Sequence, residues 1–366
     1  MMIRYTRHDS QRYSTLFNSE SGFFARIQDP GEPEPLWSRD GPELLDISVT
    51  GWCDQGCTFC YRSSTTAGTH MSVDDFKYLM TEAERAGVLQ VALGGGNPNQ
   101  HPKFVELLRI AREEHGIVPS FTTNGKGLSA AVLAGAAKYC GGVAISAYAP
   151  YKTTARAVER LGGVGIAPNI HTVFSRQSIP QILEWLEQPP EWLERANALI
   201  LLNYKPVGRE AGALDLAKLD PRWRDVIRLA TGKKRSFQIG FDSCCITGLL
   251  QEASAHPSSL EPCDAGRFSM FVSETMRAFP CSFMAELCEG HDVRSRGLLE
   301  VWRDGSLFRK FRERLVPASC GGRTDGQSCL GGCHLFPEIN FCECGGDKAG
   351  VLDERGRLIQ VSISTS

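Results

Sequence analysis

The sequence predicts an α/β fold in which a partial (β/α)6, TIM-like barrel is followed by a loop-rich, cysteine-rich domain. Short β-branched runs alternate with amphipathic stretches from residue 44 to about residue 205. Glycine, cysteine and proline become more frequent after about residue 235, where long apolar periodicities fade. Ten of the 14 cysteines lie between residues 244 and 344, and three others directly follow the first predicted strand.

The alternating elements define a parallel sheet. Ser72 is a favourable helix N-cap and Gly87 a favourable helix stop, which fixes the first helix. Regular strand–helix alternation favours parallel strands with right-handed crossovers. Six units are too few for a closed eight-unit barrel, so we expect an open barrel, with a doubly wound sheet as the alternative. The expected strands are 44–50, 89–95, 118–125, 142–148, 167–175 and 196–205, and the expected helices are 72–87, 101–116, 129–141, 151–162 and 179–188.

The chain divides into four predicted parts. We expect an N-terminal extension over residues 1–43 with one or two strands, the barrel over 44–235, the cysteine-rich domain over 236–350 and a tail over 351–366. Within the third part, "FQIGFDS" is an expected strand, and residues 298–315 are an expected helix. A region with so few apolar runs needs another source of stability, which bound metal would supply.

Charge and hydropathy exclude several classes of protein. The 366 residues carry a formal net charge of -2, which provides no long-range field for nucleic acid or an anionic membrane. No apolar run approaches the roughly 20 residues of a membrane span, and the N-terminal stretch has no apolar signal-peptide core. We therefore expect a cytoplasmic protein, in which 14 cysteines bind metal or react rather than form disulfides.

Cys53, Cys57 and Cys60 form the spacing "CDQGCTFC" in the loop after the first strand. In a barrel this loop lies at the rim where chemistry is placed. Three thiolates can hold three irons of a [4Fe–4S] cube and leave the fourth iron open. The alternatives are a chance grouping or bound zinc.

This motif, with Phe59 at its aromatic position, resembles the signature CxxxCxΦC of the radical S-adenosylmethionine (radical SAM) superfamily. The resemblance implies that Cys53, Cys57 and Cys60 hold a [4Fe–4S] cluster whose open iron binds S-adenosylmethionine. It further implies that one electron cleaves this cofactor to a 5′-deoxyadenosyl radical, which takes a hydrogen atom from the substrate.

Segments at the ends of later strands also resemble this family. "LGGGNP" at 93–98 resembles the motif GGE, which binds the cofactor's amino group, with Gly95, Gly96 and Asn97 at its three positions. Asn97 replaces the usual acid, and its amide can still accept a hydrogen bond from an ammonium group. Ser146 is a candidate for a ribose or carboxylate contact.

Two further polar residues receive structural interpretations. Asn124, in "TTNG", is expected to shape a turn, and His171, on the fifth strand, is expected to be a core histidine with satisfied hydrogen bonds. "NYKPVGR", after the sixth strand, is also similar to the family.

The C-terminal cysteines resemble the SPASM extension of radical SAM enzymes, which binds two auxiliary iron–sulfur clusters. Met276 occupies a usual glycine position, and Arg323 stands where a cysteine belongs. A four-thiolate zinc site is the alternative for the later cysteines. The resemblance implies one auxiliary cluster on Cys263, Cys281 and Cys333 with Cys244 or Cys245, and a second on Cys320 and Cys329 with Cys342, Cys344 or both.

These resemblances imply an enzyme that modifies a ribosomally made peptide or protein. The reaction would form a thioether or carbon–carbon link, oxidise a side chain or invert a Cα centre, with a flavodoxin or ferredoxin as electron donor. The residues before the first strand look too few for a leader-binding winged helix, so recognition would come from a partner, the rim or an edge strand. The alternatives are a small metabolite or cofactor precursor as substrate, or a catalytically silent iron–sulfur or zinc scaffold. No general acid or base can be assigned from the sequence.

Overall fold

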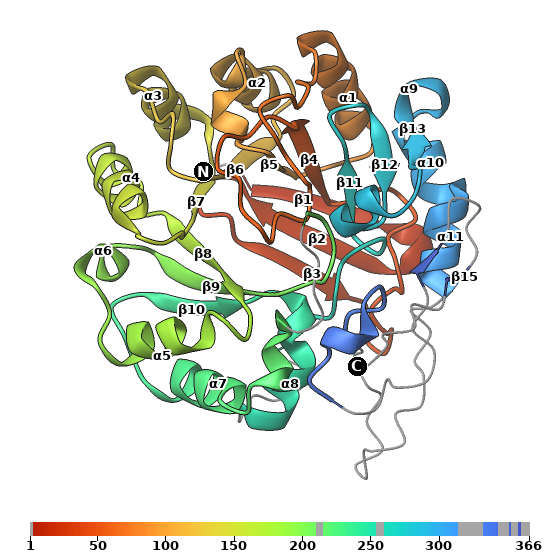
Figure 1. Ribbon diagram of the computed structural model, residues 1–366. Helices are drawn as coiled ribbons and strands as arrows, with labels where there is room; N and C mark the ends of the chain where they lie inside the picture. The colour runs from red at the N-terminus through yellow and green to blue at the C-terminus, as the bar shows by residue number, and fades with distance from the viewer. Residues whose placement is uncertain are drawn as a thin grey trace.

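A curved arc of strands with helices on its outer side forms the centre of the molecule (Figure 1). The computed structural model describes residues 3–209, 215–253, 260–313 and 332–342, together with the backbone of 351–352 and 358–359. The strands are β1 (Ile3–His8), β2 (Tyr13–Asn18), β3 (Phe24–Gln28), β4 (Leu44–Thr50), β5 (Gln90–Gly95), β6 (Val118–Thr123), β7 (Gly142–Ser146), β8 (Asn169–Phe174), β9 (Ala198–Asn203), β10 (Gln238–Phe241), β11 (Ser269–Val272), β12 (Arg277–Phe279), β13 (His291–Asp292), β14 (Val351–Leu352) and β15 (Leu358–Ile359).

The helices connect the strands of the arc. They are α1 (Val73–Arg85), α2 (Phe104–Arg109), which continues as a π-helix over Ile110–Glu114, α3 (Ala130–Tyr139), α4 (Lys152–Gly162), α5 (Ile179–Glu187), α6 (Glu191–Glu194), α7 (Trp223–Gly232), α8 (Ile246–Glu252), α9 (Val293–Arg296), α10 (Leu298–Asp304) and α11 (Ser306–Glu313). Within the described ranges, each of these helices is too short or too polar to cross a lipid bilayer.

The main sheet has ten strands in the order β10-β9-β8-β7-β6-β5-β4-β11-β12-β13. Strands β4 to β10 pair in parallel along the chain, and β11 adds to the free edge of β4, also in parallel. The helices that follow β4 to β8 lie on the outside of the arc, whereas a doubly wound sheet carries helices on both faces (Figure 1). The predicted α/β class and partial barrel are therefore confirmed.

Strand β4 shows how the sequence separates core from cavity. Leu45, Ile47 and Val49 are fully buried, and they belong to the same hydrophobic core as the apolar residues of α1. The alternate residues Asp46 and Ser48 face the other side of the pleat, because successive side chains of a strand point to opposite faces. Helix α1 begins after Ser72, whose side chain accepts a hydrogen bond from the Asp75 N–H at 3.0 Å, as predicted.

Two local predictions need correction. The N-terminal residues form three antiparallel strands, β1 to β3, rather than one or two, and Phe17 and Phe24 pack against Leu89 and Val118 at the beginnings of β5 and β6. The single helix expected over 298–315 is two helices, α10 and α11. Gly305 interrupts them with an extended backbone, and a side chain there would collide with the Val301 carbonyl.

Sheet hydrogen bonds cross the predicted domain boundary between residues 235 and 236. Strand β10 pairs with β9, and β11 pairs with β4, so residues on both sides of that boundary share one sheet. The four-part domain division stays a prediction. What the structure adds is that residues 269–272 are fixed against the first barrel strand by backbone hydrogen bonds.

Arg26 fastens the N-terminal sheet to the barrel. Its guanidinium donates to Glu43 at 2.8 Å and to Asp264 at 3.2 Å and lies 3.7 Å from the ring centroid of Phe268. Burial raises the pKa of Glu43 to about 7 and also raises the pKa of Asp264. The Glu43 carboxylate therefore depends on this one cation, which also lies beside Asp264.

We predict that Arg26→Met lowers the free energy of unfolding by about 3 kcal/mol at pH 8, because it leaves the buried Glu43 carboxylate without its cation and removes one of two cations near Asp264. At pH 5 the loss should be smaller, since Glu43 can then take up a proton. Urea unfolding at both pH values measures the difference. Arg7→Met, which removes the more exposed pair with Asp29, should change the free energy of unfolding much less than Arg26→Met does. Equal losses for the two variants at both pH values would contradict the prediction.

Candidate functional site

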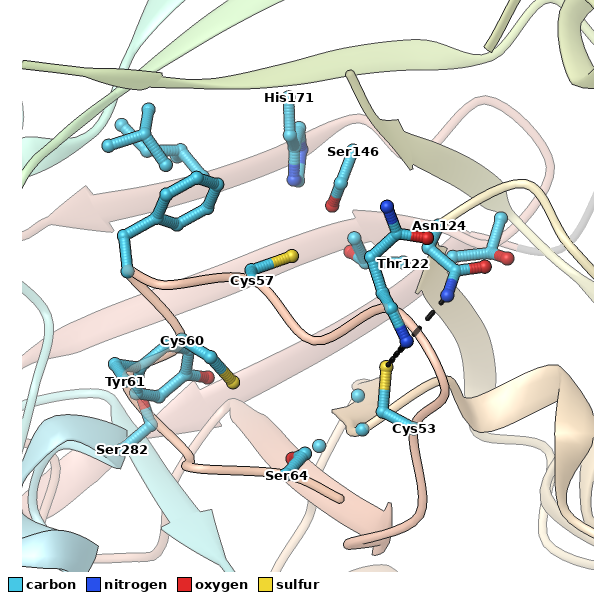
Figure 2. A pocket seen from close by; sticks show the side chains of 18 of the residues that line it. Cys53, Cys57, Cys60, Tyr61, Ser64, Thr122, Asn124, Ser146, His171 and Ser282 are labelled. Carbon is cyan, nitrogen blue, oxygen red and sulfur yellow. Dashed lines mark hydrogen bonds between the residues drawn. The ribbon is translucent and has the colours of Figure 1, made fainter. Parts of the chain in front are cut away.

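A cavity of about 420 Å³ lies at the carboxyl ends of the barrel strands. Cys53, Cys57 and Cys60 all line it, and no fourth cysteine is among the described residues of its wall. The three thiols come from one loop, as Figure 2 shows. This arrangement fits the expectation of three protein ligands and one open position.

The cysteine loop, residues 51–69, has little regular structure and is held closed at its base. The Gly51 N–H donates to the Thr69 carbonyl at 2.8 Å, and the Cys53 N–H donates to the Thr65 carbonyl at 3.0 Å. Strand β5 adds a second support, because the Asn97 N–H donates to the Trp52 carbonyl at 2.9 Å. The loop conformation therefore depends on backbone contacts from outside the motif.

The segment after β9 clamps the same loop from the opposite side. The Arg209 guanidinium donates to the Cys57 carbonyl at 3.0 Å and to the Ser64 carbonyl, and its backbone N–H donates to the Cys60 carbonyl at 3.1 Å. Gly208 has a φ of 100°, and a side chain there would collide with the backbone of Cys60. The segment "NYKPVGR", which is similar to the family, therefore holds the cysteine loop in place. The sequence alone did not reveal this role.

Each of the first two thiols has a polar neighbour. The Asn124 amide nitrogen lies 3.8 Å from the Cys53 sulfur, and Tyr148 lies beside Cys57 in the cavity wall. Asn124 also shapes the turn as predicted, since its Oδ1 accepts a hydrogen bond from the Lys126 N–H at 2.9 Å. Burial raises the pKa of both Cys53 and Cys57, so both thiols stay protonated at pH 7 unless a cation such as iron binds them.

The spacing of the thiols bears on the choice between zinc and an iron–sulfur cluster. Among the described residues, no three His, Cys, Asp or Glu side chains lie close enough to hold one metal ion together. A tetrahedral zinc site requires such closeness, whereas the thiolates of a cube bind different irons. Binding of a cluster by Cys53, Cys57 and Cys60 stays a prediction.

Gly95 and Gly96 bring β5 into contact with the loop. Gly95 has a φ of 105°, a conformation that favours glycine, and a side chain there would overlap the Ser48 hydroxyl. The Gly96 N–H donates to the Thr50 carbonyl at 2.6 Å, and a Cβ on Gly96 would overlap the Trp52 carbonyl. Both glycines line the cavity, where their backbone can approach a ligand.

Asn97 does not reach the cavity, which corrects the expectation of a ligand contact. It is fully buried, and its Oδ1 accepts hydrogen bonds from the Thr123 hydroxyl at 2.9 Å and the Asn124 N–H at 3.1 Å. Its Nδ2 donates to Gln100 and to the Lys126 carbonyl. The side-chain amide is therefore fully used in joining β5 to the turn after β6.

Three other residues of the wall lie where a ligand could meet them. Phe59 lines the cavity with its ring centroid 5.8 Å from that of Tyr148, and Ser146 lines it from the end of β7. His171 was expected in the core, but it lines the cavity beside Ser146 (Figure 2). Burial lowers the pKa of His171 to about 4, so its imidazole is neutral at pH 7.

Asp46 is a cavity residue that the sequence interpretation missed. Its carboxylate lines the wall, and the structure gives it no hydrogen bond or ion pair to another described residue. The nearby cation Arg62 is already paired, with Glu274 at 3.0 Å and Glu286 at 3.4 Å. Burial raises the pKa of Asp46 to about 7. The sequence did contain a signal for this role, because Asp46 is an acid at an alternate position of a mainly apolar strand.

A second group of thiols gathers beside the far wall of the cavity. Cys244, Cys263, Cys281 and Cys333 pack against the same hydrophobic cluster, and Cys263, Cys281 and Cys333 interact electrostatically with Cys244. Burial raises the pKa of Cys263, to about 11, and that of Cys281. Ser282, which directly follows Cys281, lines the cavity itself. The structure thus brings together the four cysteines expected for the first auxiliary cluster.

The structure separates the two adjacent cysteines that the sequence left as alternatives. Cys245 is fully buried in the main hydrophobic core, with its sulfur 4.0 Å from the Leu201 carbonyl, whereas Cys244 joins the second thiol group. Cys342 is half-buried at the end of a described segment. Cys320, Cys329 and Cys344 lie outside the described residues, so the second auxiliary site stays a prediction.

Comparison with known proteins gives consistent matches. The family described as the Radical SAM superfamily matches residues 47–173. The chain is 31% identical over 300 residues to a PqqA peptide cyclase of Rhodopseudomonas palustris, covering 74% of this chain and 76% of that protein. It is 26% identical over 317 residues to the mycofactocin maturase MftC of Mycobacterium ulcerans, covering 80% and 83%. The fold is similar to that of Streptococcus suis SuiB, with a TM-score of 0.68, 18% identity and coverage of 91% and 94%.

We predict that Gly96→Ala weakens the cysteine loop, because its methyl group must displace the Trp52 carbonyl. Anaerobically reconstituted variant protein should bind up to about four fewer irons per chain than the wild type, the content of one cube. Gly94→Ala is the matched control, since a Cβ at Gly94 meets nothing within 4 Å. Equal iron content in the two variants would show that the close approach of β5 does not hold the loop.

We predict that Asp46 loses its proton near pH 7. Between about pH 4 and pH 7 the folded state holds a proton that the unfolded state has released, so this group makes stability fall as pH rises. Relative to Asp46→Asn, the wild type should lose roughly 2 to 3 kcal/mol between pH 5 and pH 8. The infrared difference spectrum of the wild type minus Asp46→Asn should show a carboxylic-acid band that titrates near pH 7, since the contribution of Glu43 cancels in the difference. Asp75→Asn should keep that band, because Arg294 holds the pKa of Asp75 low.

Proposed function

Because this chain belongs to the radical SAM superfamily, we propose that it uses S-adenosylmethionine and a [4Fe–4S] cluster on Cys53, Cys57 and Cys60 to modify a ribosomally made peptide. The observation that carries this proposal is the convergence of these three thiols on one cavity whose described wall contains no fourth cysteine. When bound, the cluster supplies the electron that cleaves S-adenosylmethionine to a 5′-deoxyadenosyl radical, which takes a hydrogen atom from the substrate.

The residues of the cavity wall would bind and orient the reactants. Gly95 and Gly96 present backbone groups to the cofactor's amino end, while Ser146 and the neutral His171 can hydrogen-bond its ribose or carboxylate. Phe59 and Tyr148 supply an aromatic surface beside Cys57.

We further propose that Cys244, Cys263, Cys281 and Cys333 hold an auxiliary iron–sulfur cluster. Support comes from their mutual contacts and from their position behind the cavity wall. Four thiolates would complete the ligand set of a [4Fe–4S] cube, so this centre is suited to passing electrons rather than binding substrate directly. A second auxiliary cluster would use the cysteines outside the described residues.

The choice of a peptide as substrate rests on relatives that align with most of the chain. They are named for the maturation or cyclisation of peptides, and the chain covers more than two thirds of each. A crosslink or oxidation would remove two hydrogen atoms, whereas Cα inversion would exchange one hydrogen with solvent. We expect a flavodoxin or ferredoxin as donor and a cytoplasmic location, where reducing conditions preserve thiols and clusters.

The test is cofactor cleavage. Anaerobically reconstituted protein with dithionite should release 5′-deoxyadenosine, and the triple variant Cys53/Cys57/Cys60→Ala should release at least 100-fold less, on the order of the background expected without an open iron. Cys140→Ala is the control, because Cys140 ends helix α3 and does not line the cavity. No release from the wild type would support the silent scaffold instead.

The substrate class needs a separate measurement. A short peptide encoded beside this gene, incubated with the active enzyme, should lose the mass of two hydrogen atoms or incorporate deuterium from heavy water. Cofactor cleavage that responds to a small metabolite but to no such peptide would overturn the peptide assignment while leaving the radical chemistry intact.

A further inference from the structure

Lys205 is a buried cation placed between the cavity and the second thiol group. It follows β9, and only 6% of the residue is exposed. Its ammonium forms an ion pair with Asp242 and lies 5.0 Å from the ring centroid of Phe283. Lys205 and Asp242 both line the cavity. A charge buried to this extent is costly unless its partners hold it in place.

The same ammonium lies beside the thiols. Phe283, whose ring it faces, packs against the same hydrophobic cluster as Cys244, Cys263, Cys281 and Cys333, and Lys205 interacts electrostatically with Cys244, Cys281 and Cys333. The Asp242 carboxylate is the negative partner of this ion pair. Its Oδ1 is buried without a hydrogen-bond partner in the described part of the chain. One fixed positive charge and one fixed negative charge therefore lie beside the four cysteines.

Fixed charges change the reduction potential of an iron–sulfur cluster. Reduction adds one negative charge, which a nearby cation stabilises and a nearby anion destabilises, and hydrogen bonds to the ligand sulfurs act in the same direction as a cation. In a buried site such effects are screened less than at the surface. Lys205 meets these conditions for a cation, since its charge is buried and lies beside the four cysteines.

We propose that Lys205 is a positioning residue that raises the reduction potential of the centre on Cys244, Cys263, Cys281 and Cys333, and that Asp242 limits this increase. The inference rests on the proposed auxiliary cluster. It adds the direction of electron transfer to that proposal. With Lys205 in place, the centre favours accepting an electron from the cavity side.

Removing the positive charge and removing the negative charge should shift the midpoint potential in opposite directions. A merely structural role of these residues would not produce such opposite shifts. In full-length reconstituted protein, Lys205→Met should shift the midpoint potential of this centre to more negative values, and Asp242→Asn should shift it to more positive values. Lys205→Arg, which keeps the charge and a donor, should stay close to the wild type. Redox titration followed by electron paramagnetic resonance measures the shifts, in a Cys53/Cys57/Cys60→Ala background that removes the first cluster. The signal is assigned by its loss in Cys263→Ala.

The outcomes separate the inference from the function on which it rests. Full iron content with unchanged potentials, or with shifts of the same sign in Lys205→Met and Asp242→Asn, would overturn the role of Lys205 alone. An iron content of the triple-Ala background that does not fall on adding Cys263→Ala would overturn the auxiliary centre itself, and the inference with it. If Lys205→Met binds little iron, the positive shift in Asp242→Asn decides the question.

Discussion

The cysteine loop cannot hold its own shape, and the rest of the site depends on the contacts that hold it. Residues 51–69 contain little regular structure, so their backbone groups need partners elsewhere. Strand β5 supplies donors through Gly96 and Asn97, and the segment after β9 supplies Arg209. These supports come from opposite sides of the barrel opening. The positions of the three thiols are therefore a property of the whole barrel rather than of the motif.

Sheet pairing links the two thiol groups in a similar way. Strand β11 pairs with β4 so that Phe271 lies opposite Asp46, and β11 and β12 lead to Cys281. The loop with the first thiols begins at the end of β4. Backbone hydrogen bonds, rather than the length of a linker, thus fix the distance between the proposed radical site and the proposed auxiliary cluster. A fixed distance suits electron transfer between buried centres, because neither centre has to move.

The sequence predicted most of the fold and the composition of the first thiol site, because both rest on local patterns. Alternation of strands and helices and the spacing of Cys53, Cys57 and Cys60 are readable along the chain. The sequence could not show which of two neighbouring residues faces the hydrophobic core and which faces the cavity or the thiols. Cys244 and Cys245 are adjacent and chemically identical, and only the packing of Cys245 into the core separates them. The positions of His171 and Asp46 were hard to predict for a similar reason. They line the cavity because the sheet is curved and turns one face of each strand toward it.

Asn97 shows that a residue at a motif position need not have the role that is usual for that position. A carboxylate can only accept hydrogen bonds, whereas an amide both donates and accepts. Here the donor side of Asn97 meets Gln100 and the Lys126 carbonyl, and the acceptor side meets Thr123 and the Asn124 N–H. An acid in this buried place would face the Lys126 carbonyl with no proton to offer. The amide therefore joins β5 to the turn after β6, and in the proposed function an ammonium group at this rim would be bound by the backbone of Gly95 and Gly96 rather than by the Asn97 side chain.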